Sequence, residues 1–135
     1  MLKLNNKGQS LVLFVVLLPI LLFVIVLVVD VGTIMTSKQD LNNINYMMVD
    51  YGLDNMGKED IESEITNYIL LNTNKLDNID VRVIDNEVYI YMQKYEKSLI
   101  SHIFNIKGFQ IVSEYKGTII KDKKSIERIK WYYGY

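Results

Sequence analysis

Four acidic side chains gather in one short segment of the chain: Glu59, Asp60, Glu62 and Glu64. Carboxylates at this density could hold a cation, but the segment lacks the alternating oxygen ligands and the central glycine of a calcium loop. We interpret the acids as the solvated first turns of a helix, where the helix dipole favours negative charge. The one histidine, His102, stands among apolar residues, which favours a partly buried loop residue over a catalytic base.

The composition removes several other kinds of site. The 135 residues include no cysteine, which excludes a disulfide scaffold, a thiolate metal site, cysteine catalysis and N-terminal lipidation. Glycine-rich phosphate loops, paired metal ligands and nucleophile elbows are absent. A net charge of −1 gives no general case for nucleic acid. We therefore expect no catalytic residue, no cofactor and no metal, and neither nucleic acid nor a small-molecule substrate as a partner.

The strongest signal is an apolar run of nineteen residues from Leu11 to Val29 without a polar or charged side chain. As a helix it spans roughly 28 Å, close to the thickness of the hydrocarbon core of a bilayer. Pro19 removes one backbone hydrogen bond, which membrane helices tolerate. Asp30 follows directly, and we expect it in the headgroup region, where its charge stays unburied. The sequence therefore predicts a transmembrane helix over residues 11–30.

Two other interpretations of the run fit less well. The apolar region of a cleaved signal peptide is shorter and ends in an A-x-A-like site, and this chain has no alanine. A buried core helix would need more apolar surface around it than a chain of this length offers. Lys3 and Lys7 precede the run without any acid, so the positive-inside rule predicts a cytoplasmic N-terminus, residues 1–10, and an extracytoplasmic domain, residues 31–135. The localisation predicted is the cell membrane, with a single pass.

The helical pattern continues beyond the apolar run. Between residues 33 and 53 one stripe recurs at helical spacing, and Gly52 and Gly57 bracket its end. We interpret this stripe as core packing, in preference to a groove for a partner. A second helix is predicted over residues 58–71, where Ile61, Ile65 and Ile69 recur every four residues. The first stripe comprises Ile34, Ser37, Leu41, Ile44, Met48 and Tyr51.

The pattern then changes to the alternation typical of strands. Residues 79–83 and 88–92 alternate apolar and polar side chains, and Asp85-Asn86 between them predicts a hairpin. Residues 94–107 fit a short helix or an ordered loop. A third strand is predicted over 109–120, with a bulge or bend at Gly117. The fold class is therefore α+β: a transmembrane helix continuing into an amphipathic helix, then a second helix and a three-stranded, mainly antiparallel sheet.

Charge is unevenly distributed along the chain. Residues 30–87 contain twelve acids and four bases, and residues 88–135 contain nine bases and four acids. The two halves attract each other, which suits a compact domain or head-to-tail neighbours. The last fifteen residues mix bases with Trp131 and three tyrosines, a combination that could also contact nucleic acid or a membrane interface. We favour a solvated tail, or a short helix whose aromatic side chains pack on the sheet.

The residues around the apolar run also fit a family pattern. The segment Lys7-Gly8-Gln9-Ser10-Leu11-Val12-Leu13-Phe14 precedes Leu18-Pro19 and Asp30-Val31-Gly32. This order resembles the start of TadE/TadG-like proteins, the pilin-like minor components of tight-adherence (Flp-type) pilus assembly systems. The resemblance covers residues 7–32. It implies a pilin-like stem, with Phe14, Pro19, Asp30 and Gly32 as anchor and motif residues and Gly8 as a possible prepilin-type processing site.

One position departs from the TadE branch of that family. In that branch, as in prepilins, the fifth residue after the processing glycine is a glutamate, and here it is Leu13. The chain is thus more similar to the TadG branch, which an uncleaved segment anchors, and we expect residues 1–8 to stay attached.

These observations lead to one functional hypothesis and two alternatives. The resemblance implies a non-enzymatic structural component of a tight-adherence pilus or related secretion apparatus, a minor pilin-like or assembly protein. Its partners would be the lipid bilayer, other pilin-like subunits and pilus assembly platform proteins. The first alternative is a membrane-anchored extracellular binding or sensor module unrelated to pili. The second, far weaker alternative is a small enzyme subunit.

Overall fold

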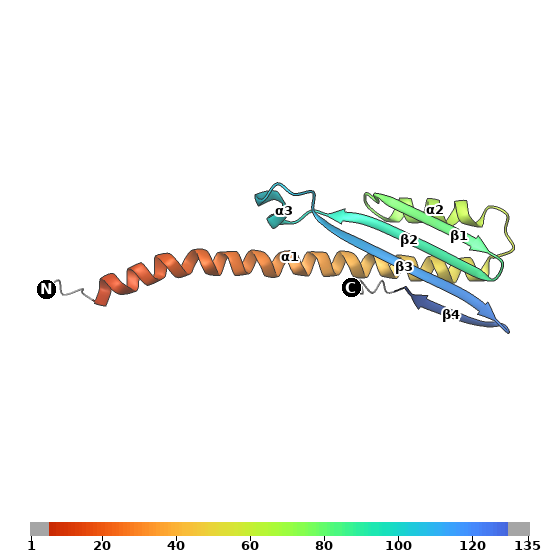
Figure 1. Cartoon of the computed structure of the whole chain (residues 1–135), viewed down its shortest axis with the longest axis horizontal. Helices are drawn as coiled ribbons and strands as arrows, with labels where there is room; N and C mark the ends of the chain where they lie inside the picture. Colours follow the sequence, from red (N-terminus) through yellow and green to blue (C-terminus); the bar gives the residue numbers. More distant parts are fainter. Residues whose placement is uncertain (1–5, 130–135) are drawn as a thin grey trace, which may run out of the picture.

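One continuous helix of 49 residues runs through the whole molecule. In the computed structural model, which describes residues 6–129, this helix is α1 (Asn6–Asp54). At 1.5 Å per residue it is about 73 Å long. Its N-terminal half projects as a gently curved stem, and its C-terminal half lies along a sheet (Figure 1). The helix continues through Pro19 without a break. The predicted transmembrane and amphipathic helices are therefore a single element.

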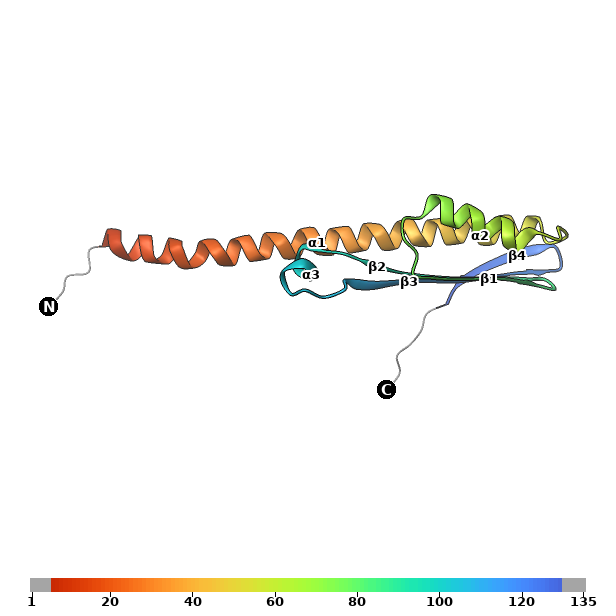
Figure 2. The ribbon, with the colours of Figure 1, turned by 90° about the horizontal axis from the view of Figure 1, so that it is seen from above.

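Four antiparallel strands form the sheet, in the order in which they occur along the chain. They are β1 (Asn78–Ile84), β2 (Glu87–Glu96), β3 (Phe109–Ile120) and β4 (Lys123–Arg128). Helix α1 and the shorter α2 (Ile61–Asn72) both cover one face of this sheet (Figure 2). A five-residue helix, α3 (Leu99–Ile103), lies in the connection between β2 and β3. The α+β class is confirmed.

The core lies between the two helices and the sheet. The predicted stripe on α1 faces inward, where Ser37, Leu41 and Met48 are buried. The three isoleucines predicted for α2 are also buried. They meet the inward side chains of β2, Val88, Ile90 and Met92, which are fully buried. The stripe is thus core packing, as predicted.

The β1–β2 hairpin forms where the sequence predicts it. Ile84 pairs with Glu87, so Asp85 and Asn86 make a two-residue turn. Asp85 adopts a φ of 50°, a left-handed conformation that aspartate tolerates better than most residues. The alternating apolar residues of both strands consequently fall on the helix-covered face.

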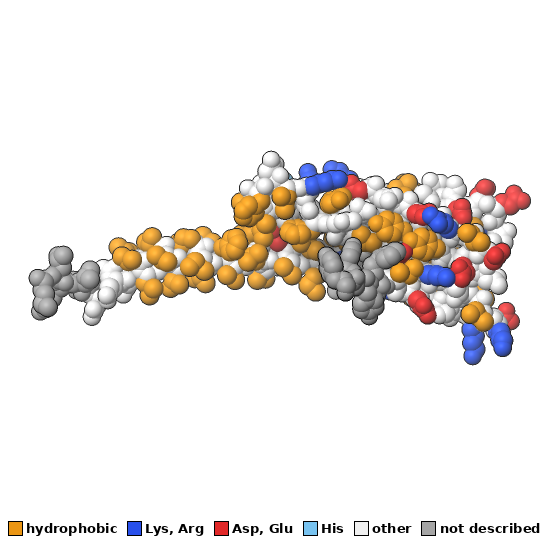
Figure 3. Space-filling model, in the orientation of Figure 1, with side chains coloured by type: hydrophobic (Ala, Val, Ile, Leu, Met, Phe, Trp, Pro, Cys, Tyr) orange, Lys and Arg blue, Asp and Glu red, His pale blue; other side chains and the backbone are white. Residues whose placement is uncertain are grey.

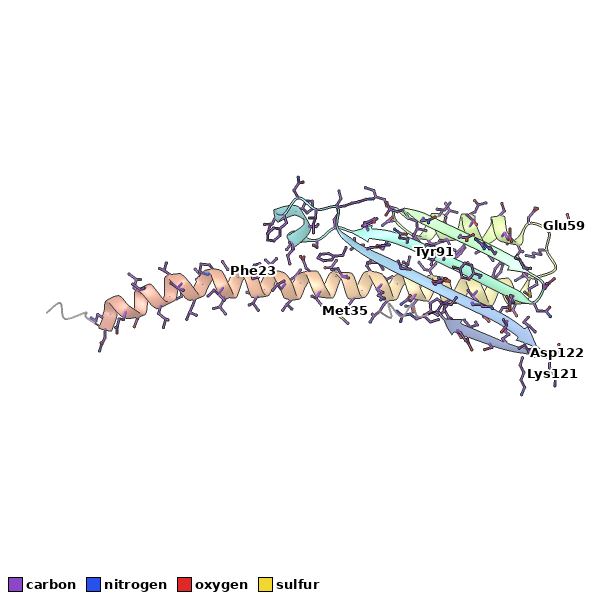
Figure 4. The ribbon with its side chains drawn as sticks, in the orientation of Figure 1. Phe23, Met35, Glu59, Tyr91, Lys121 and Asp122 are labelled. Carbon is purple, nitrogen blue, oxygen red and sulfur yellow. The ribbon has the colours of Figure 1, made fainter. Side chains whose placement is uncertain are left out.

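The predicted number of strands is wrong, because the sheet has a fourth strand. β4 occupies residues that the sequence assigned to a solvated tail or short helix. Lys121 and Asp122 both have positive φ and form the tight turn that leads into it (Figure 4). Ile126 then pairs opposite Gly117 at the edge of the sheet. The prediction that the aromatic side chains of Trp131 and the following tyrosines pack on the sheet concerns residues outside the described range.

The bulge or bend predicted at Gly117 is also wrong. Val88 pairs with Gly117 and Tyr89 with Lys116, so the register runs through the glycine unbroken. The reason for glycine is close packing. A Cβ atom on Gly117 would lie 2.5 Å from Val49 Cγ1 and 2.8 Å from Leu53 Cδ1, both on α1. The missing side chain lets the helix approach β3.

Other boundaries differ by small amounts. α1 ends at Asp54, between the two glycines that were expected to bracket its end, but Gly52 lies inside the helix and is buried against Val88 and Ile65. α2 begins at Ile61, three residues later than predicted. Of the two possibilities left open for residues 94–107, a short helix forms. His102 lies in it and is exposed, not partly buried in a loop as expected.

Ion pairs link the acidic and basic parts of the chain, as the uneven charge suggested. Lys124 Nζ of β4 lies 2.9 Å from Asp50 Oδ1 and 2.5 Å from Asp54 Oδ1, both on α1. Lys116 Nζ lies 3.1 Å from Glu87 Oε1. These side chains are well exposed, so the ion pairs add little to the stability of the fold.

Candidate membrane anchor

The stem of α1 exposes its apolar side chains on every side. Among residues 6–129, α1 is the one helix long and apolar enough to cross a membrane. Its exposed large side chains from Leu11 to Val29 range from 37% accessible at Leu27 to 67% at Val28. Apolar atoms therefore cover the stem, whereas charged side chains gather over the sheet (Figure 3). A helix apolar all round without protein contacts is suited to lipid.

The structure places the predicted motif residues on separate turns of this one helix. Phe14 is 61% exposed and Pro19 is also exposed. A Cβ atom added to Gly8 or to Gly32 would meet no atom within 4 Å. These residues are therefore not brought together into a site. Of the predicted set, Asp30 alone is buried.

Asp30 binds the start of α3. Its Oδ1 accepts a hydrogen bond of 2.9 Å from the Leu99 N–H, and its Oδ2 accepts one of 2.8 Å from the Ile100 N–H. These two N–H groups belong to the first turn of a helix, where no intrahelical partner exists. Asp30 is only 3% exposed, so the expectation of an unburied charge is wrong. The carboxylate instead joins the end of the stem to a segment 69 residues away.

A second polar contact follows two turns along α1, about 10 Å further on. Ser37 Oγ donates a 2.8 Å hydrogen bond to Glu96 Oε2 at the end of β2. Lys94 Nζ lies 3.2 Å from the same oxygen. Burial favours a higher pKa for Glu96, but the hydrogen bond from Ser37 and the contact with Lys94 outweigh it and leave that pKa below its ordinary value. The contact therefore favours a charged carboxylate.

A third polar residue marks the middle of the packed half of α1. Asn45 is fully buried, and its Nδ2 donates to Ile90 O and to Ser113 Oγ, each at 3.1 Å. Because hydrogen bonds to a strand carbonyl need a fixed position, Asn45 favours one register of α1 across the sheet. Asn45 follows Leu41 by four residues and precedes Met48 by three, so it lies on the same face of α1 as the apolar stripe. A polar residue at this position was the sequence signal for a buried hydrogen bond.

An open groove of about 700 Å³ separates α1 from the end of β2. Gly32, Thr33 and Thr36 line one side of it, and Tyr95 and Lys97 the other. Ser37 and Glu96, which form the second polar contact, also line the groove. In the described part of the chain no group of three or more histidine or acidic side chains is placed to hold a metal ion. The arrangement serves to join a stem to a sheet, and we find no convergent catalytic groups among the residues described.

Comparison with known proteins agrees with the resemblance noted in the sequence. Residues 8–44 match the Tad family model, described as Flp pilus-assembly TadE/G-like. The match covers about a quarter of the chain and extends from the stem into the first turns of α1 that pack on the sheet. No curated protein matches the chain, and no solved structure matches it. The resemblance to TadE/TadG-like proteins is thus confirmed for the stem.

Proposed function

We propose that this protein is a single-pass membrane component of a tight-adherence (Flp-type) pilus or a related secretion apparatus. In this proposal it acts as a minor pilin-like or assembly protein without enzymatic activity. The observation that carries the proposal is the continuity of α1. The family match begins in its exposed apolar stem and ends in its packed half, so one rigid element joins the lipid-seeking part to the sheet.

The proposed topology places residues 1–10 in the cytoplasm and the domain from residue 31 onward outside. It is supported by Lys3 and Lys7 before the apolar run. Because the chain contains no cysteine, a maleimide signal measured on the purified chain comes from the introduced cysteine alone. An impermeant maleimide should label Leu71→Cys, at the exposed end of α2, in whole cells stripped of outer layers. It should label Asn6→Cys, which leaves Lys3 and Lys7 in place, only after the membrane is permeabilised, and the opposite pattern would reverse the orientation.

The proposed partners are the lipid bilayer, other pilin-like subunits and pilus assembly platform proteins. Leu13 supports a retained component over a bulk fibre subunit, because an apolar side chain cannot set the register of neighbouring helices by charge. It is 59% exposed on the stem and so can contact sister helices in the bilayer.

Crosslinking in the native membrane tests these partners. A photoreactive residue at Leu13 should recover pilin-like or platform proteins, whereas the same residue at Leu71, on the sheet side, controls for random collisions. If the residue at Leu13 recovers no such protein beyond what the Leu71 control recovers, the pilus assignment is refuted. The alternative of a binding or sensor module unrelated to pili would then be the better description.

A further inference from the structure

The connection between β2 and β3 exposes apolar side chains and buries polar ones. We name residues 97–108 the α3 loop. Ile103 is 67% exposed and Phe104 is 63% exposed, and Leu99 and Ile106 are each about half exposed. Ser98 and Ser101, in contrast, are buried. This arrangement is the reverse of what a water-exposed loop requires.

The α3 loop holds these apolar side chains outward by a fixed backbone. Ser98 and Ser101 form a reciprocal capping box at the start of α3. The Phe104 N–H donates to Ile100 O at 3.0 Å, and the Ile106 N–H donates to Ser101 O at 2.9 Å. The exposed side chains therefore belong to an ordered surface in which many backbone N–H groups already have partners.

The position of the α3 loop along α1 is fixed by Asp30. Its two hydrogen bonds to Leu99 and Ile100 hold the first turn of α3 at the end of the apolar run. Both ribbon views place α3 beyond the ends of the strands, at the stem side of the sheet (Figures 1 and 2). In the side-chain view α3 lies on the side of the sheet toward Phe23, which is on the stem (Figure 4). If the stem spans a bilayer, α3 lies at its boundary.

Charge around the α3 loop fits the same location. Lys97 and Lys107 flank the apolar side chains and are exposed. Lys107 Nζ lies 4.1 Å from the centre of the Tyr95 ring, on the sheet side of the loop. Exposed apolar side chains and exposed cations thus occur together in the α3 loop, which Asp30 holds next to the end of the apolar run. Segments that lie in a membrane interface combine these two features.

We propose that the α3 loop is a second membrane contact. Its apolar side chains enter the headgroup and acyl boundary of the leaflet on the side of the sheet domain, alongside the stem. The proposal rests on the proposed function, because it requires α1 to span the bilayer. With the stem as the one anchor, α1 could tilt in any direction, and the second contact would favour tilts that bring the α3 side of the sheet domain toward the membrane.

Depth-dependent quenching in the full-length protein tests this proposal. Single cysteines at Val16, Ile103 and Ile84 would each carry a polarity-sensitive fluorophore, in phosphatidylcholine and phosphatidylglycerol vesicles. Ile84 is the matched control, because it is 61% exposed and apolar but is the last residue of β1, whose arrow points away from the stem (Figure 1). Nitroxide lipids labelled at mid-chain should quench the probe at residue 16, and nitroxides near the headgroup should quench the probe at 103. Aqueous iodide should quench strongly only the probe at 84.

A further variant tests whether the apolar side chains cause the insertion. In a protein with the reporter at Leu99→Cys, the replacements Ile103→Ser and Phe104→Ser remove two largely exposed apolar groups. Exposure of the reporter to iodide should rise on the order of tenfold, the effect expected for losing the partial burial of two such side chains. An unchanged exposure would contradict the proposal, since the loop would then be held in place by the protein alone.

The outcomes separate the two proposals. If the probe at 16 is quenched by lipid and the probe at 103 is as open to iodide as that at 84, the α3 loop proposal is overturned and the membrane span stands. If the probe at 16 escapes lipid quenching, the proposed membrane function itself fails. Protection of residue 103 that varies with the protein-to-lipid ratio and lacks lipid quenching would indicate a second copy of the chain as the occupant, which also overturns the proposal.

Discussion

Replacing Gly117 with alanine should destabilise the fold by an amount that the structure allows us to work out. The added Cβ would lie 2.5 Å from Val49 Cγ1 and 2.8 Å from Leu53 Cδ1. Leu53 can move the end of its side chain, but Val49 is β-branched and has one strongly preferred rotamer in a helix. α1 must therefore shift away from β3. Overpacking of this kind costs about 1–3 kcal/mol.

The loss is measurable as a shift in the unfolding temperature of the full-length protein in detergent. For a domain of about 100 residues each kcal/mol corresponds to about 4–8 °C. Gly57→Ala is the matched control, because nothing lies within 4 Å of its added Cβ. The clash also predicts coupling: Val49→Ala should cost less in the Gly117→Ala protein than in the natural one. If Gly117→Ala unfolds at the same temperature as Gly57→Ala, our explanation of this glycine is refuted.

Three further predictions concern the stem and its junction with the sheet. The replacement Asp30→Asn leaves one acceptor oxygen for the two N–H groups of Leu99 and Ile100. Backbone amides of the α3 loop should therefore exchange with deuterium faster, as measured by mass spectrometry, and unchanged exchange rates would contradict the role of the carboxylate. Because the pKa of Glu96 in the folded chain lies below its ordinary value, its charged form should stabilise the fold above that value, and this contribution should be lost as the pH falls through the folded pKa. In urea unfolding series Ser37→Ala should therefore reduce the acid-induced loss of stability, and an identical pH dependence would argue against the contact. N-terminal sequencing of the membrane-extracted protein should find residues 1–8 attached, and a chain cleaved after Gly8 would overturn the argument from Leu13.

The sequence predicted well those elements whose apolar residues follow a clear period. The stripe from Ile34 to Tyr51, the isoleucines of α2 and the β1–β2 hairpin all place the side chains expected of them in the core or packed against it. In each case the spacing of apolar residues is the same property that places them in the core. Local pattern and tertiary structure therefore agree.

β4 was missed because its sequence lacks that pattern. Ile126 is its one apolar residue, and Lys121 and Asp122 are not the usual pair for a turn with positive φ at both positions. The strand forms because β3 offers an open edge whose backbone groups need partners. Its charged side chains then face solvent at the edge, where they discourage pairing with other chains.

The contacts of Asp30 and Gly117 could not be predicted for a different reason. Asp30 binds a segment 69 residues away, and Gly117 is a glycine because of side chains on α1. Neither partner lies within a window of local sequence. From the local sequence, an acid after an apolar run is explained by a position among the headgroups, and a glycine within a strand is explained by a bulge. The structure shows instead that Asp30 is buried against α3 and that Gly117 makes room for α1.

Because α1 is one continuous helix, a tilt of its stem is transmitted to its packed half. From Asp30 to Asp54 the packed half is about 36 Å long and moves with the stem as one body. A tilt of about 20°, which is ordinary for transmembrane helices, would carry the Asp54 end sideways by about 12 Å. If α1 spans a bilayer as proposed, a change in bilayer thickness or a push from a neighbouring helix that tilts the stem would therefore displace the far end of the sheet by more than the diameter of a helix backbone.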